Sequence, residues 1–90
     1  MKSTHIPEFA GDITEVPAAG SVVVDSGLRE VQAATCSLAQ DSVATAAAAS
    51  IEVGSPRAGS TVLLTIKTWA ADGATAGSTA ANVGWMALGK

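Results

Sequence analysis

The sequence predicts a small all-β protein, an antiparallel β-sandwich of about six strands with an extended N-terminal arm. Two runs near the C-terminus carry this prediction. Residues 61–69, TVLLTIKTW, alternate polar and apolar side chains, and residues 82–89, NVGWMALG, alternate again. Gly, Ser and Pro turns separate further short runs and leave no room for the crossover helices that parallel strands need. We expect the two alternating runs to pair as a β-hairpin that closes the domain.

The first 20 residues differ in pattern from the rest of the chain. Residues 1–20 have no clean period and contain Pro7 and Pro17, which lack the backbone donor that a central strand needs. This segment is therefore predicted to be an extended arm, with a disordered tail as the alternative. Its scattered large apolar side chains favour an arm that packs on something, such as a neighbouring subunit. The candidate partner-binding residues are Ile6, Phe9, Ile13 and Val16.

Residues 21–90 form the predicted sandwich domain. Its first strands are residues 21–25, SVVVD, and residues 31–38, VQAATCSL, whose Cys36–Leu38 end is expected to face inward. Residues 44–53 are ambiguous, because their alanine-rich start has high helix propensity while their end, Ile-Glu-Val, is typical of a strand. We predict a strand over residues 46–53, and one helix, giving an α+β fold, is the alternative. The GSPRAG segment at residues 54–59 has strong turn chemistry.

Composition indicates a thin core. The chain has 90 residues, which is one small domain near the lower limit for folding alone. Nineteen of its residues are alanine, and a buried methyl group stabilises by only about 0.8 kcal/mol, against roughly 1.5–3 kcal/mol for Val, Leu or Ile. Small scaffolds with thin cores usually need disulfides, a metal or a partner subunit. One Cys and one His make the first two remedies poor candidates, so we expect an oligomer.

Charge and hydropathy exclude several classes of partner. The net charge is −3, and the five basic residues are scattered, so no basic stripe for nucleic acid is present. The most apolar stretch, residues 44–53, is too short and too polar to span a bilayer. The N-terminus lacks the long apolar run of a signal peptide. We expect neither a nucleic-acid nor a membrane partner, and no cofactor.

The chain carries no arrangement of residues that is typical of an enzyme. His5 is the single histidine and lies in the predicted arm, and Cys36 lies in an alternating strand, where a free Cys is usually a small core residue. The glycines match neither phosphate-binding motif. Trp69 and Trp85 have two interpretations: core or interface aromatics, which we favour, or a platform for a sugar ring. The prediction is a non-enzymatic protein with no catalytic, metal or cofactor residues.

Three short segments carry a resemblance to a known class of protein. They are SGLREV at residues 26–31, TIKTW at residues 65–69, and the closing AANVGWMALG at residues 80–89. With these segments the chain resembles small virion proteins of tailed bacteriophages, of the head decoration (cement) or head-fibre type, and H-type lectin-like trimeric β-sandwich modules. The resemblance covers roughly two thirds of the chain, from about Ser26 onward.

This resemblance implies a virion structural protein that is made in the host cytoplasm and sits on the capsid surface or tail. As a capsid decoration protein it would bind and stabilise the major capsid lattice as an oligomer, so its expected partners are the major capsid protein and itself, as a homotrimer. The alternative is a tail, collar or fibre component, or a lectin-like receptor-binding module that uses Trp69 or Trp85. A matching polar sugar-binding set is missing from the sequence, which argues against glycan binding.

Overall fold

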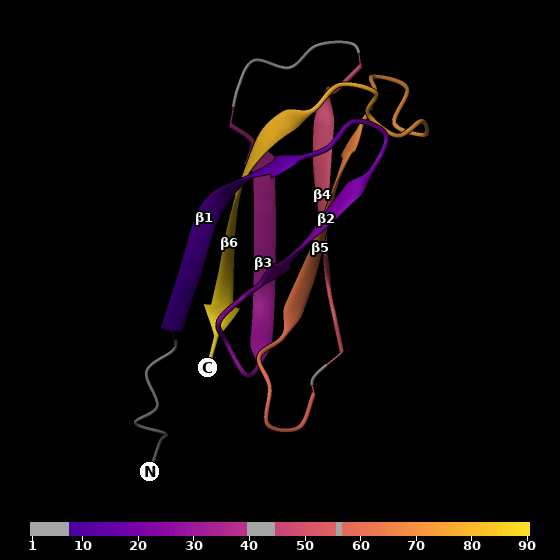
Figure 1. Cartoon of the computed structure of the whole chain (residues 1–90). Helices are drawn as coiled ribbons and strands as arrows, with labels where there is room; N and C mark the ends of the chain where they lie inside the picture. Colours follow the sequence, from indigo (N-terminus) through magenta and orange to yellow (C-terminus); the bar gives the residue numbers. More distant parts are fainter. Residues whose placement is uncertain (1–7, 40–44, 56) are drawn as a thin grey trace.

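The computed structural model describes residues 8–39, 45–55 and 57–90. These residues form six β-strands and no helix, which confirms the predicted all-β sandwich. The strands make two three-stranded antiparallel sheets, one in the order β1-β6-β3 and the other in the order β2-β5-β4 (Figure 1). The strand bounds are β1 Glu8–Val16, β2 Ser21–Asp25, β3 Val31–Leu38, β4 Ala48–Val53, β5 Leu63–Trp69 and β6 Ala81–Gly89.

The predicted strands over residues 21–25 and 31–38 are confirmed as β2 and β3. The ambiguous segment is also a strand, β4, so the helical alternative is wrong. It begins two residues later than predicted, at Ala48, and its alternate residues Ala49 and Ile51 pack against the core. Helix propensity is a weak preference, and here the pairing of β4 with β5 along its whole length overrides it.

The predicted hairpin between the two alternating runs is wrong. β5 pairs with β2 and β4, whereas β6 pairs with β1 and β3, so the two strands lie in different sheets. β5 instead forms a hairpin with β4 through the turn at residues 54–60, where the Ser60 amide donates to the Arg57 carbonyl. Each of the two most apolar strands is thus the centre of its own sheet. The loop between them carries the chain from one sheet to the other.

The segment predicted as an arm contributes a strand to the fold. β1 pairs with β6 along its whole length, from Glu8 opposite Gly89 to Val16 opposite Ala81, and Figure 1 shows it along the edge of its sheet. Pro17 follows β1 directly and therefore ends the strand without interrupting its hydrogen bonds. The strand alternates, so Ala10 and Val16 face the core while Phe9 and Ile13 face outward.

The core lies between the inner faces of the two central strands. β5 presents Leu64, Ile66 and Thr68 inward, and β6 presents Val83, Trp85 and Ala87, all of them buried. The alternation of residues 61–69 predicts that Val62, Leu64 and Ile66 share one face, and all three are buried. Side chains from the four flanking strands complete the core, together with Leu28 from the β2–β3 connection. They are Ala10, Val16, Val22, Val24, Val31, Ala34, Cys36, Leu38, Ala49 and Ile51.

Polar side chains fix the connections at both ends of the sandwich. Asp25 accepts hydrogen bonds from the Thr61 hydroxyl and the Gly27 amide, and these bonds lower the pKa of its carboxyl group. In the β5–β6 loop, Asp72 accepts bonds from the Thr75 hydroxyl and from the amides of Thr75 and Ala74, which together lower its pKa to about 2. The long loop of small residues is therefore organised around one carboxylate.

The position of Ile66 at the centre of the core gives a stability prediction. Ile66→Ala leaves a cavity between the two sheets, so we expect the free energy of unfolding to fall by about 2–5 kcal/mol in urea titrations. Val23→Ala is the matched control, because Val23 is 56% exposed on the outer face of the same sheet. Its loss should stay below about 1 kcal/mol. Equal losses for the two variants would contradict the assignment of the faces.

Candidate functional site

The two outer faces of the sandwich differ in chemistry. On the outer face of β2-β5-β4, hereafter the polar face, the Trp69 indole N–H donates to Ser50 Oγ at 2.8 Å. The Lys67 ammonium lies 4.5 Å from the centroid of the Trp69 ring, in the geometry of a cation–π interaction. Glu52 and Asp25 are exposed on the same side of this sheet. Its one large aromatic ring is therefore covered by polar partners.

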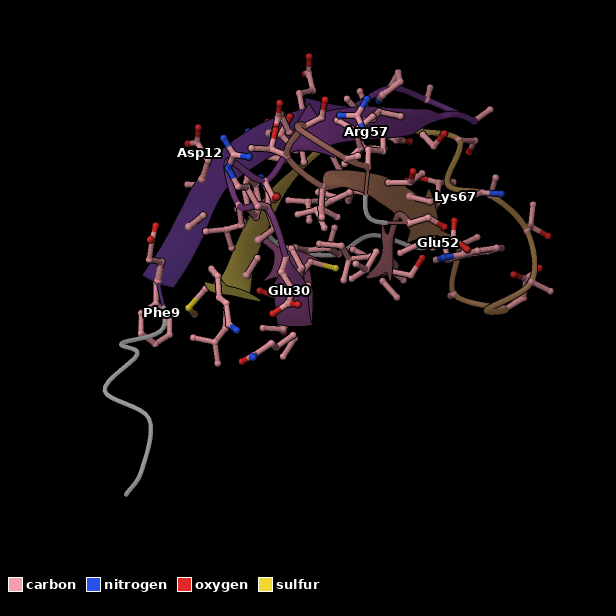
Figure 2. All side chains as sticks on the ribbon, turned by 90° about the horizontal axis from the view of Figure 1, so that it is seen from below. Phe9, Asp12, Glu30, Glu52, Arg57 and Lys67 are labelled. Atoms are coloured by element: carbon pink, nitrogen blue, oxygen red, sulfur yellow. The ribbon has the colours of Figure 1, made fainter. Side chains whose placement is uncertain are left out.

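The outer face of β1-β6-β3, hereafter the apolar face, has no such cover. Three large hydrophobic side chains stand out from it: Phe9 is 70% exposed, Ile13 is 64% exposed and Met86 is 49% exposed. By alternation the face carries one charged residue, Glu15, at one end, and the exposed Asp12 of the edge strand β1 also borders it. Figure 2 shows Phe9 on the opposite side of the molecule from Lys67 and Glu52. By strand alternation, the face comprises Phe9, Gly11, Ile13, Glu15, Ala33, Thr35, Ser37, Asn82, Gly84, Met86 and Leu88.

The register places the large and small residues of the apolar face in rows. One row across the sheet is Phe9, Leu88 and Ala33, and another is Ile13, Gly84 and Ser37. In both rows the large side chain lies on β1 and the small one on β3. A bulge between Val31 and Ala33 sets this register, because it lets Val31 and Ala34 both face the core.

Two hollows of about 250 Å³ each lie on either side of Met86. Asp12, Ser37 and Gly84 border the first, and Phe9, Ala33 and Leu88 border the second, with Met86 and Thr35 common to both. Gly84 opens the first hollow, since a Cβ atom added there would meet nothing within 4 Å. The face is thus ridged along β1 and hollowed over β6 and β3.

The four residues proposed for partner binding lie in different places. Phe9 and Ile13 stand on the apolar face, Val16 is fully buried in the core, and Ile6 lies outside the described residues. The split follows from strand period, because positions 9 and 13 share a face that position 16 does not. The apolar run at residues 82–89 favours Met86 as a core residue, and this is wrong, because Met86 is 49% exposed. Its alternation with Trp85 indicated the opposite face, but nothing in the sequence indicated that this face stays uncovered.

The two tryptophans also have different environments. Trp85 is 9% exposed and belongs to the core cluster, which supports the packing interpretation of this residue. Its indole Nε1 and the Thr68 hydroxyl are buried and have no hydrogen-bond partner among the described residues. Trp69 is half-buried on the polar face, where Ser50 and Lys67 hold it. The rings therefore lie in opposite sheets and form no common platform.

The described part of the chain offers little acid–base or metal chemistry. No group of three or more His, Cys, Asp or Glu residues that could hold a metal ion is found there. Cys36 is half-buried against the core, as expected, and burial raises the pKa of its thiol. His5 lies outside the described residues. Within the same residues, no helix has the length and apolar character needed to cross a bilayer.

Comparisons with known proteins returned nothing: no family model, no curated protein and no solved structure matches this chain. The apolar face is therefore the candidate functional site on physical grounds alone. Contiguous exposed apolar surface on a small soluble domain commonly marks an interaction site.

The placement of the two tryptophans can be checked by fluorescence. In Trp69→Phe the remaining emission comes from buried Trp85, so we expect it to be blue-shifted from the wild type and poorly quenched by acrylamide. Trp85→Phe should show the reverse, with emission from the half-exposed Trp69. Emission from Trp69→Phe that is as accessible to acrylamide as free tryptophan would contradict the buried position of Trp85.

Proposed function

We propose that this protein is a non-enzymatic structural protein of a virion, which decorates the capsid as an oligomer and joins its assembly through the apolar face. The observation that carries the proposal is the cluster of exposed Phe9, Ile13 and Met86 on a sheet face whose two charged neighbours, Asp12 and Glu15, both lie on the edge strand β1. Burying such a face is favourable because it removes apolar surface from water, provided that these two carboxylates keep their contact with solvent at the edge. The resemblance of residues 26–31, 65–69 and 80–89 to phage virion proteins supports the virion as the setting.

The thin core supports an assembly role independently. Only ten hydrophobic residues are buried in the described part of the chain, and three of them are alanine. A domain of this size is marginal on its own, and burial of the apolar face against a protein partner would add to its stability. The geometry gives less support to a lectin-like receptor binder, because Trp85 is buried and Trp69 is held by Ser50 and Lys67.

Mass spectrometry of purified virions from cells that carry the gene tests this proposal. We expect the protein in fixed stoichiometry to the major capsid protein, whereas a tail component would scale with the tail proteins. Ile13→Ser should lower its incorporation, and Val23→Ser, at a similarly exposed position on the polar face, should not. Absence of the protein from virions would rule out the proposed function.

A further inference from the structure

We propose that the partner seated on the apolar face is a second copy of this chain, related by a two-fold axis parallel to β6. The inference rests on the proposed function only for its biological setting. Its physical basis is the self-complementary relief of the face, whose two carboxylates, Asp12 and Glu15, both lie on the edge strand β1.

The rows of the face indicate where the axis lies. Two sheets that pack face to face keep their strands roughly aligned, about 10 Å apart. An axis parallel to β6 exchanges the outer strands, so β1 of one copy lies over β3 of the other while each row stays at its own level. Phe9 then lies over the partner's Ala33, and Ile13 lies over the partner's Ser37 beside the hollow at Gly84. Large side chains meet small ones in both rows.

The alternative in-plane axis fits the face poorly. An axis perpendicular to the strands would stack β1 on β1 and β3 on β3. Phe9 and Ile13 would then compete for space with the ridge of the other copy, and the small residues Ala33, Thr35 and Ser37 would leave a void. Only the parallel axis places the ridge of each copy over the hollows of the other, which is the reciprocal contact of a two-fold interface.

Met86 and Glu15 fit the same arrangement. Met86 lies on the central strand between the two hollows, so it meets its own counterpart near the axis. A flexible thioether can adapt to that self-contact. Glu15 lies at the end of the face, in the row of Asn82, and therefore falls on the solvated rim. The two Glu15 carboxylates lie on opposite sides of the axis and do not face each other.

The area of the face sets the strength of the contact. Three strands about 4.8 Å apart and eight or nine residues long give a projected face of roughly 380–440 Å² per copy. Side-chain relief raises this value, yet the face stays below the roughly 800 Å² per partner of a standard stable interface. We therefore expect a dimer that dissociates on dilution through the micromolar range. On a lattice, such a dimer presents two attachment points and binds by avidity.

Sedimentation equilibrium of the purified protein, from low-micromolar to near-millimolar concentration, tests the dimer without any virion component. We expect a monomer–dimer equilibrium for the wild type. Ile13→Lys and Ser37→Glu, both at exposed positions, should each weaken dimerisation at least about tenfold. Gly84→Leu should do the same by filling the hollow, and its monomer should stay folded because the added side chain points into open space. Val23→Lys on the polar face is the control and should dimerise as the wild type does.

A mixing experiment tests the register. Ile13→Lys and Ser37→Glu copies together should form a heterodimer, since one contact becomes a Lys–Glu pair and the other keeps its native residues. Phe9→Lys mixed with Ser37→Glu should not, because those rows lie four residues, about 13 Å, apart along the strand. A wild type that is monomeric throughout would overturn the proposal, as would a trimer or a Phe9→Lys mixture that rescues equally well. None of these results bears on whether virions contain the protein.

Discussion

The fold depends on the packing of two central strands against each other. Leu64 and Ile66 of β5 meet Val83 and Trp85 of β6 between the sheets, and the flanking strands add mostly small or half-buried residues. Because alanine contributes little hydrophobic stabilisation, these few large side chains supply most of the core. The edge strands β1 and β2 add smaller side chains to this core, namely Ala10, Val16, Val22 and Val24, and are also held in place by backbone pairing.

A second consequence is the contrast between the two outer faces. The polar face has its aromatic ring fixed by Ser50 and Lys67, so it presents hydrogen-bonding and charged groups to water. The apolar face presents Phe9, Ile13 and Met86 with little polar cover. Exposed apolar surface of this kind promotes aggregation of an isolated domain, whereas in a subunit it can be buried at an interface. The same alternation that builds the core thus also places the surface through which we propose the chain associates.

Strand identity could be predicted from the sequence, but strand neighbours could not. Alternation indicates which side chains share a face, and residues 62, 64 and 66, which share one, are all buried. It does not state which strand lies alongside, so β5 and β6 were wrongly paired. Val16 lies three residues after Ile13 in β1, and this odd spacing places the two side chains on opposite faces of the sheet. The sequence did not show this difference, because residues 1–20 have no clean period from which a strand could be predicted. The exposure of Met86 depends on which elements cover the outer face of its sheet, and this cannot be predicted from the residues around Met86 in the sequence.

The claim that a second copy covers the apolar face is tested most directly by methyl NMR spectra of the wild type recorded over a dilution series. The account predicts that the Met86 and Ile13 methyl resonances shift together with concentration, following one dissociation constant. The Val23 methyls on the polar face should stay fixed. Concentration-independent Met86 and Ile13 resonances, or shifts centred on Val23, would contradict it.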